Sequence, residues 1–433
     1  MIRSVVLARA LGTGLLLVLA ALGPVRCVAM GAESQRIELP GGQQVETRRF
    51  AGTGRATLLW LPSERGFGNA ADDHAARLAE LGHTVWIADL HASYRVEPGR
   101  DSIRRFPLQQ VTELLEIIAA GADSRLFLMS SGRGAQLALI AAREWQLRHP
   151  GEPALAGLFL SHAHLYAARA APGEDAEYLP IVHATNLPVY LLAAEYSTKA
   201  SRLEELATAL QSGGSKVYRQ RLASVRGGFA NRSVERSTDP DRAARLGFPA
   251  TVSRALSLLG SHAPPARAHP TRLDTRRLGQ PASRVAGLRP IDRELATPAL
   301  RLNDIAGAAF DLDEHRGEVL LVNFWASWCR PCVTEIPSLH RLADQLADED
   351  FGIVTVNVGE SRQQVERFMQ QVPVELPVLM DYDSSVSRDW KLYVYPSSYL
   401  LDRHGKIRYA YLGALEWDSM ENVEIIRDLL SRP

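Results

Sequence analysis

Cys329 and Cys332 form a CxxC motif that directly follows an apolar run, residues 320–328. The run is typical of a buried strand, and a strand leading into a helix that opens with CxxC is suited to thiol-disulfide exchange. The only other cysteine in the sequence is Cys27, near its start. The motif therefore predicts a strand and then a helix at this point, with any redox chemistry carried by Cys329 and Cys332.

The first 31 residues have the features of a secretory signal peptide. Arg3 and Arg9 precede an apolar run at residues 15–22, and small residues follow near position 31. Because the run is shorter than the roughly 20 residues that span a bilayer, we expect cleavage, with a retained membrane anchor as the alternative. The chain would contact a membrane only if this segment stayed uncleaved.

An exported chain with one CxxC pair and no structural cysteines is expected to use that pair chemically, because exported compartments are oxidising. We therefore expect the periplasm or another exported compartment. The formal net charge of the chain is zero. This composition gives no electrostatic reason to expect a nucleic-acid partner.

Two domains are expected, because 433 residues exceed the usual length of one domain. Residues 36–261 alternate apolar runs with amphipathic stretches, which predicts a mainly parallel α/β sheet covered by helices. Residues 262–293 are rich in Pro, Ala and Arg and predict an extended linker. Residues 294–433 resume the alternation in the order βαβαββα. The strands predicted in the first domain are residues 57–61, 84–88, 126–129, 155–160, 189–193 and 217–223.

The turn at residues 130–134 lies where a strand gives way to a helix, as the nucleophile elbow of an α/β-hydrolase does. That elbow reads GxSxG. Aligned on Gly134, this chain has Ser130 at the first glycine and Gly132 at the nucleophile. The first domain thus resembles an α/β-hydrolase that has lost its catalytic serine, and we expect it to be inactive.

Two further features of the first domain bear on that resemblance. Ser131 could act as a shifted nucleophile and Glu195 as the acid, but the loop after the last strand has no histidine. His162, His164 and His183 lie earlier in the chain and are expected to have packing or surface roles. The loop at residues 62–69 is expected to line a pocket for a peptide or small ligand.

The last third of the chain carries a more specific resemblance. Residues 323–337 contain the CxxC motif with Trp328 before it and a Glu-x-Pro sequence after it, and Pro396 and Asp402-x-x-Gly405 follow downstream. This combination, in this order, resembles the TlpA-like (ResA-like) branch of exported thioredoxin-fold proteins. The resemblance implies a thioredoxin-like fold and a thiol-disulfide oxidoreductase, more often a reductase than an oxidase.

The residues of the motif can be given separate roles. Cys329 would lie at the first turn of a helix, where the helix dipole favours the thiolate, so we expect it to be the attacking nucleophile. Cys332 lies one turn deeper and is placed to resolve the mixed disulfide. Arg330 adds positive charge, Pro331 restricts the turn, and Trp328 would close one side of the site.

The resemblance implies roles for three more residues. Pro396 is expected to follow a cis peptide bond, which leaves the backbone of Tyr395 open to pair with an extended substrate. Glu335 resembles the acidic residue near the thiols of TlpA-like proteins and is the candidate for proton transfer. The alternative for Glu335 is a solvated helix glutamate. Asn323 occupies the strand position where cytoplasmic thioredoxins have a buried aspartate.

A metal site is the main chemical alternative for a CxxC pair. Four-coordinate zinc would need histidines, and His340 and His404 lack ligand-like spacing. Copper(I) held by two thiolates is chemically allowed. We expect no metal and no cofactor other than a redox-active Cys329–Cys332 disulfide.

The sequence therefore predicts an exported thiol-disulfide oxidoreductase that acts on a disulfide-containing client protein. A reductant in an oxidising compartment must be recharged, which implies a membrane electron donor as a second partner. Two alternatives stay open. The chain could be a binding or scaffold protein whose first domain recruits a client, or an active serine hydrolase.

Overall fold

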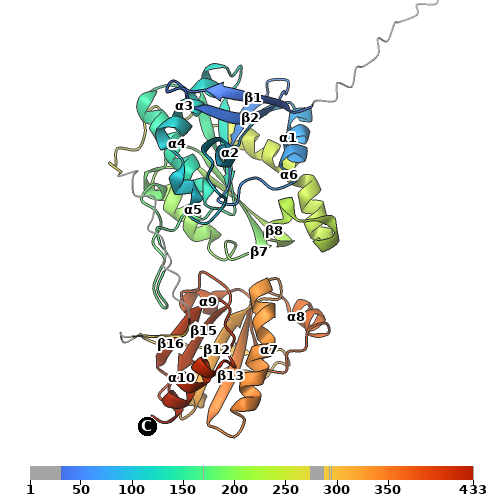
Figure 1. Ribbon diagram of the computed structural model, residues 1–433, viewed down its shortest axis with the longest axis vertical. Coiled ribbons are helices and arrows are strands. Elements are labelled where there is room, and N and C mark those ends of the chain that lie inside the picture. The colour runs from blue at the N-terminus through green and yellow to red at the C-terminus, as the bar shows by residue number, and fades with distance from the viewer. Residues whose placement is uncertain (1–30, 169, 274–286, 292, 294, 433) are drawn as a thin grey trace, which may run out of the picture.

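The computed structural model describes residues 31–168, 170–273, 287–291, 293 and 295–432. The predicted signal peptide lies outside these residues apart from its last position. Within the described ranges, no helix is both long enough and apolar enough to cross a lipid bilayer. The described strands form an eight-stranded sheet, a six-stranded sheet and a small two-stranded sheet. We call the part built on the eight-stranded sheet the first unit and the part built on the six-stranded sheet the second unit (Figure 1).

The sheet of the first unit has the strand order β1-β2-β4-β3-β5-β6-β7-β8. From β4 to β8 neighbouring strands pair in parallel, whereas β2 is antiparallel to both β1 and β4. The predicted mainly parallel α/β sheet is therefore confirmed. Its strands are β1 (Glu33–Glu38), β2 (Gln44–Phe50), β3 (Ala56–Trp60), β4 (His83–Ala88), β5 (Leu126–Ser131), β6 (Leu155–Ser161), β7 (Val189–Tyr196) and β8 (Val217–Arg226).

The hairpin of β1 and β2 is the part of this sheet that the sequence pattern did not predict. β1 has no fully buried residue, and its sequence is mostly polar. An edge strand of this kind lacks the apolar run that marks a strand buried on both faces. Of the six strands that were predicted, β3 to β7 lie further inside the sheet, and β8 forms its opposite edge.

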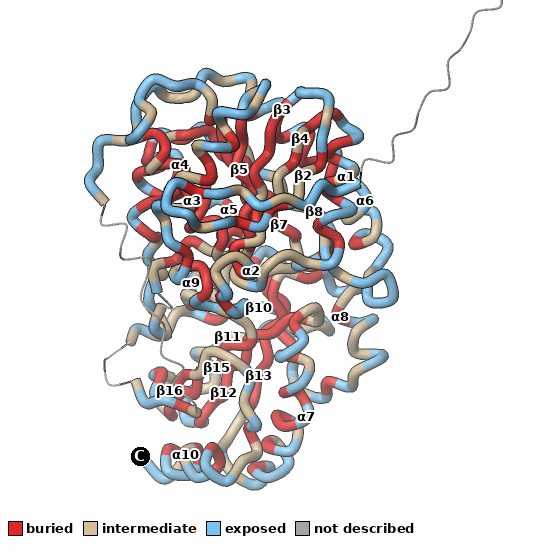
Figure 2. Tube along the Cα trace, turned by 45° about the horizontal axis from the view of Figure 1, so that its top comes forward, coloured by how far each residue is buried: buried red, intermediate tan, exposed pale blue. Residues whose placement is uncertain are grey.

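Helices cover both faces of the first sheet, so its strands form the buried centre of the unit (Figure 2). Leu115 of α3, Leu137 of α4 and Leu206 of α5 belong to one hydrophobic cluster. Leu78 of α1 and Phe248 of α6 belong to the cluster on the other face. The helices are α1 (Ala71–Glu80), α2 (Leu90–Tyr94), α3 (Leu108–Ala120), α4 (Gly134–Arg148), α5 (Leu203–Ser212) and α6 (Asp239–Gly260).

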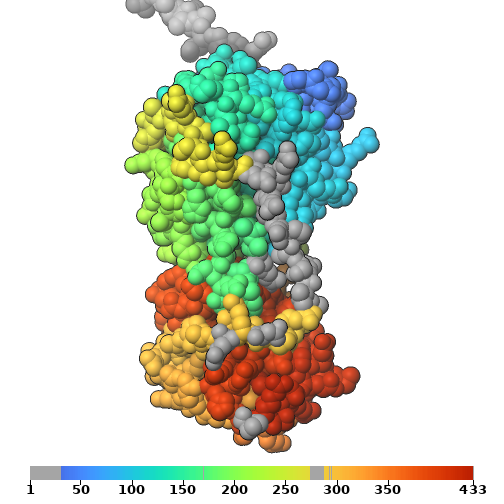
Figure 3. Space-filling model, turned by 90° about the vertical axis from the view of Figure 1, so that its left-hand side faces the viewer, coloured from blue at the N-terminus to red at the C-terminus, as the bar shows by residue number. Residues whose placement is uncertain are grey.

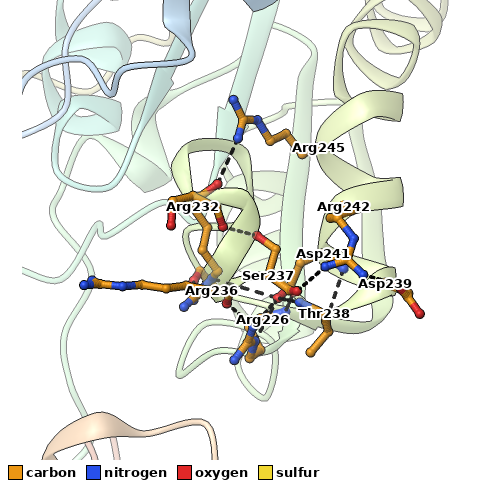
Figure 4. A network of polar contacts seen from close by, with 11 residues as sticks. Arg226, Arg232, Arg236, Ser237, Thr238, Asp239, Asp241, Arg242 and Arg245 are labelled. Atoms are coloured by element: carbon orange, nitrogen blue, oxygen red, sulfur yellow. Dashed lines mark hydrogen bonds and ion pairs between the residues drawn. The ribbon is translucent and has the colours of Figure 1, made fainter.

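A buried carboxylate fixes the connection between β8 and α6 (Figure 4). Asp241 is fully buried and accepts hydrogen bonds from the Arg226 backbone at 2.9 Å and from the Arg226 guanidinium at 2.8 and 2.6 Å. The backbone N–H of Asp241 in turn donates to the Thr238 hydroxyl at 3.3 Å, which completes a capping box. Both ends of the intervening loop, residues 227–238, are thus held in place.

The sheet of the second unit has the order β14-β13-β12-β15-β16-β9. β12 pairs in parallel with β13 and antiparallel with β15, so it is central. Its strands are β9 (Arg289–Pro290), β12 (Val319–Trp325), β13 (Phe351–Val358), β14 (Val378–Asp381), β15 (Ser397–Leu401) and β16 (Ile407–Leu412), with β10 (Arg301–Asn303) and β11 (Ala309–Asp311) forming the two-stranded sheet. Its helices are α7 (Arg330–Gln345), α8 (Arg362–Met369), α9 (Ser385–Asp389) and α10 (Met420–Leu430).

The predicted order βαβαββα for the second unit is incomplete. The structure adds β14 and α9 between α8 and β15, and β9 to β11 before β12. These additions are short: β14 has four residues and β9 has two. Segments of this length give no usable periodicity in the sequence.

The predicted linker, residues 262–293, is not a free tether where the structure describes it. The Ala266 carbonyl accepts a hydrogen bond from the Gly151 N–H at 2.7 Å, and the Arg267 carbonyl accepts one from Asn186 at 2.8 Å. At the other end, β9 pairs with β16 of the second sheet. The segment is therefore held by both units, and the exact domain boundaries stay a prediction.

Candidate active site

Cys329 and Cys332 are joined by a disulfide at the start of α7, with their Cα atoms 5.3 Å apart. Cys329 is the N-cap residue of the helix, and its Sγ accepts the Cys332 N–H at 3.3 Å. Cys329 is 6% exposed, whereas Cys332 is 0% exposed. The sulfur at the helix N-terminus is thus the more accessible one, as expected for the pair.

The disulfide lies in an apolar cluster that includes Trp325, Ile336 and Met380. Apolar surroundings favour a neutral thiol over a thiolate, whereas a helix N-terminus favours the thiolate. The predicted Arg330 and Pro331 are both exposed on the first turn of α7. The thiolate of Cys329 would therefore depend on the helix end and on Arg330 for its stabilisation.

The aromatic residues predicted to line the site do lie together. The Trp328 and Tyr395 rings pack edge to face with centroids 5.9 Å apart, and both contact the cluster that contains the cysteines. The peptide bond between Tyr395 and Pro396 is cis, as predicted. Trp328, Tyr395 and Pro396 are therefore brought to the same part of the second unit as the disulfide.

Glu335 is buried, so the alternative of a solvated helix glutamate is wrong. It is 2% exposed, and its Oε1 accepts a hydrogen bond from Asn323 at 2.7 Å while its Oε2 accepts the Leu415 N–H at 3.1 Å. Burial raises the pKa of Glu335 to about 7, although these hydrogen bonds favour the carboxylate. A glutamate with this pKa can take up or release a proton near neutral pH.

Asn323 holds Glu335 from the central strand β12. Its Nδ2 also donates to the Ser398 hydroxyl at 2.9 Å, so the amide is fixed between β15 and α7. Because Glu335 follows Cys332 by three residues on the same helix, both side chains lie on one face of α7. The asparagine thus orients a buried acid on the face of the helix that bears Cys332.

A second buried carboxyl group, Glu360, was missed in the sequence. It is 3% exposed and accepts the Ser327 N–H at 2.7 Å, the Ser327 hydroxyl at 2.5 Å and an Asn357 amide N–H at 2.8 Å. Burial raises the pKa of Glu360. Ser327 lies two residues before Cys329, so Glu360 fixes the turn that leads to the motif. The only sequence signal was a glutamate two residues after the end of a buried strand, and such glutamates are too common to identify a site.

A groove of about 390 Å³ lies between the two units beside the redox motif. Trp328 and Tyr395 line it from the second unit. Glu195, the acid considered for a hydrolase, lines it from the first unit and pairs with Arg221 at 3.5 Å. The first unit therefore forms one wall of the approach to the aromatic residues next to Cys329.

Tyr393 carries much of the contact between the units. The Arg202 guanidinium lies over its ring at 4.4 Å, the Tyr166 ring packs against it with centroids 5.3 Å apart, and its hydroxyl donates to Asp175 at 3.2 Å. Lys391 also pairs with Asp175 at 2.9 Å. In the space-filling view, the first unit rests directly on the second (Figure 3).

The residues considered for serine hydrolysis do not form a triad. In the first unit as described, the Ser131 hydroxyl bonds to no histidine. The His162 ring is already occupied, since its Nε2 accepts the Ala194 N–H at 3.0 Å and its Nδ1 contacts the Ser161 hydroxyl at 2.9 Å. His183 lies elsewhere and bonds to Ser212 at 3.0 Å. Gly132 has a φ of 56°, and its position offers no nucleophile.

Metal-ligating side chains do not cluster among the described residues. Within them, no group of three or more His, Cys, Asp or Glu side chains could hold a metal ion. The residues near the disulfide are mainly apolar or aromatic, apart from the buried Glu335 and Glu360. The chemistry that this arrangement supports is exchange at sulfur with a proton acceptor nearby.

Comparisons with known proteins concern the last third of the chain. A family model described as Redoxin matches residues 293–429. The thioredoxin-like protein YneN of Bacillus subtilis is 32% identical over 127 residues, which make up 29% of this chain and 74% of that protein. The thiol-disulfide oxidoreductase ResA of the same organism is 32% identical over 122 residues, or 28% of this chain and 68% of that protein.

Among solved structures, a thiol:disulfide interchange protein of the thioredoxin family from Chlorobium tepidum is 24% identical. It covers 33% of this chain and 99% of its own, with a TM-score of 0.29. The matched residues 293–429 contain β12, the CxxC motif and α7. The predicted thioredoxin-like fold of this segment is confirmed, whereas the likeness of the first unit to an α/β-hydrolase stays a prediction. Through its C-terminal third, the chain belongs to the ResA-like family of thiol-disulfide oxidoreductases.

Proposed function

We propose that the chain is an exported reductase of protein disulfides that acts through Cys329 and Cys332. The observation that carries this proposal is the Cys329–Cys332 disulfide at the N-terminus of α7, with Cys329 the more exposed sulfur. The ResA-like relatives, named thiol-disulfide oxidoreductases, support the reaction class. No cofactor is needed, because the electron pair is stored in the two thiols.

The reaction begins with the reduced pair. The Cys329 thiolate attacks one sulfur of the client disulfide, a mixed disulfide forms, and the other client sulfur leaves as a thiolate. The Cys332 thiolate then attacks the Cys329 sulfur and releases the second client thiolate. Two electrons pass to the client, and the Cys329–Cys332 disulfide is formed.

Glu335 is proposed to accept the proton that Cys332 must lose before its attack. Its place one turn after Cys332 and its pKa of about 7 support this role. Trp328, Arg330, Pro331 and Tyr395 are proposed to contact the client, with Pro396 shaping the same surface. A membrane electron donor is proposed to return the pair to the dithiol.

The first unit is proposed to be an α/β-hydrolase-like domain without hydrolase activity. The strand order of its sheet, with β2 antiparallel and the six strands β3 to β8 parallel to one another, supports that likeness. The glycine at position 132 and the occupied ring of His162 argue against hydrolysis. Its part in the function proposed above is to restrict which clients reach the groove beside Trp328.

The direction of electron flow is tested by the reduction potential of the Cys329/Cys332 couple. We expect a value nearer the about −270 mV of thioredoxin than the about −120 mV of DsbA. Equilibration with dithiothreitol buffers, followed by alkylation and mass measurement, gives the potential. A value near that of DsbA would reverse the direction while keeping the reaction class.

The restriction by the first unit is tested with Tyr393→Ala. The change removes the ring under Arg202, a contact of about 1 kcal/mol, and should raise the fraction of molecules with an open groove about two- to fivefold. We expect insulin reduction to accelerate by a similar factor, while reduction of a small aromatic disulfide stays unchanged. Met420→Ala, on the exposed face of α10, is the control. Equal rates for insulin in the parent and in Tyr393→Ala would contradict the restriction.

A further inference from the structure

The first unit contains a cavity of about 570 Å³ that the redox mechanism does not use. It opens where the loops that follow β3, β5 and β6 meet, with the loop between β8 and α6 as a further wall. Cavities of this size hold small organic ligands. The large apolar residues lining it are Trp60, Met129, Phe229 and Phe248, and the charged ones are Glu64, Arg65, Arg100, Arg133 and Lys199.

Positive charge exceeds negative charge in this cavity. Lys199 donates to the His164 Nδ1 at 2.9 Å and lies 5.2 Å from the centre of the Tyr166 ring, but neither partner is an anion. Within the described residues, no carboxylate lies at ion-pair distance from the side chain of Lys199, Arg133 or Arg100. Lys199 and Arg133 are partly buried, whereas Arg100 is exposed. A partly buried cation without an anionic partner is unfavourable, and a bound anion would relieve that cost.

The histidines of the cavity do not add charge. Burial lowers the pKa of His162 to about 4 and that of His164 to about 2, and nearby Lys199 acts in the same direction. Burial also lowers the pKa of Lys199 to about 8, which leaves it mainly protonated at neutral pH. The cavity therefore presents fixed cations and neutral imidazoles.

The N-terminus of α4 could bind an anion through its free backbone N–H groups, but the Glu64 carboxylate already lies there. Its Oε2 accepts the Arg133 backbone N–H at 2.8 Å, and a Cβ placed on Gly132 would lie 2.5 Å from that oxygen. The helix N-terminus is thus satisfied by the chain's own carboxylate. The side chains of Lys199 and Arg133 are left for a ligand.

We propose that this cavity binds a small organic acid with an apolar body, whose anionic group pairs with Lys199 and Arg133. The apolar part lies against Phe229 and Phe248, on the wall that the Arg226 and Asp241 network fixes. The apolar and cationic lining together select against neutral lipids and against small inorganic anions. The proposal does not depend on the redox function.

The test uses the full chain in its disulfide form, with octanoate and 8-anilinonaphthalene-1-sulfonate as probes and 1-octanol as the neutral counterpart. We expect both acids to bind with a dissociation constant below about 1 mM, measured by calorimetry or fluorescence. Octanol should bind at least about tenfold more weakly. Lys199→Met and Arg133→Met should each weaken binding of the acids about tenfold or more, because each removes a charge-assisted bond.

Three further variants make the result decisive. Lys199→Arg keeps the charge and should retain most of the affinity, which separates loss of the cation from loss of the fold. Lys216→Met, an exposed residue before β8, should change nothing. Cys329→Ser should bind the acids normally, so failure here is distinguishable from failure of the redox proposal. The proposal is overturned if neither acid binds or if octanol binds as tightly as the acids. It is also overturned if Lys199→Met and Arg133→Met bind the acids with the affinity of the parent.

Discussion

Cys329→Ser is expected to lower the rate of insulin reduction by at least about a thousandfold. A serine hydroxyl at the N-cap of α7 stays protonated at neutral pH and cannot form a mixed disulfide. The remaining thiol, Cys332, is 0% exposed and cannot reach a client sulfur without a change in α7. The measurement is the initial rate of insulin precipitation with dithiothreitol as the electron source.

Cys332→Ser should behave differently, because it keeps the attacking sulfur and loses the resolving one. We expect a stable mixed disulfide between Cys329 and the client, visible as a larger species on a non-reducing gel and removed by dithiothreitol. Met420→Ala, on the exposed face of α10, is the control and should exchange at the parent rate. If Cys332→Ser reduced insulin as fast as the parent, or if Cys329→Ser formed the mixed disulfide instead, the order of attack would be wrong.

Much of the redox site could be predicted from the sequence, because its parts are local. The strand β12, the turn and the N-terminus of α7 follow one another directly, so one segment of sequence determines the position of both sulfurs. The burial of Glu335 is different. Spacing along α7 places it on the face of Cys332, but its hydrogen-bond partners Asn323 and Leu415 lie 12 and 80 residues away. Whether Glu335 is solvated or hydrogen-bonded to amide groups therefore depends on the tertiary fold.

In the first unit, too, contacts between residues far apart in the sequence could not be predicted. Apolar runs identified β3 to β7, and β8 was expected as the last strand. The loop at residues 62–69 was expected to line a pocket, as its residue Glu64 does. The cations of that pocket could not be predicted, because Arg100, Arg133 and Lys199 come from three separate loops. Each of them in isolation is an ordinary surface residue, and only the convergence of parallel strands brings them together.

Glu335→Gln is expected to remove a large pH dependence of stability. The pKa of Glu335 is raised to about 7 in the folded chain, against about 4.3 for an unfolded glutamate. The folded state therefore binds the proton of the Glu335 carboxyl more tightly than the unfolded state does. The stabilisation that this protonation gives the folded state is complete below about pH 4 and is lost as pH rises through about 7. The shift corresponds to a loss of roughly 4 kcal/mol in the free energy of unfolding between these limits.

Urea unfolding of the disulfide form at pH 5 and at pH 8 measures this effect without titration of the cysteines. The parent should lose more stability between the two pH values than Glu335→Gln does, by about 2 to 3 kcal/mol. Glu360 and Asp381, whose pKa values burial also raises, contribute equally to both proteins and cancel. Glu424→Gln, on the exposed side of α10, should leave the parent's pH dependence unchanged.

The same substitution separates a role in proton transfer from a role in packing. If Glu335 accepts the Cys332 proton, the rate at which the mixed disulfide is resolved should rise through about pH 7 in the parent and lose that inflection in Glu335→Gln. A group that only packs would change the unfolding free energy and leave the pH profile of the rate in place. A glutamine at 335 can accept a bond from Asn323 or from Leu415 but not from both, because its amide nitrogen donates. A uniform loss of stability without loss of the inflection would therefore assign Glu335 to the structure of the second unit rather than to its chemistry.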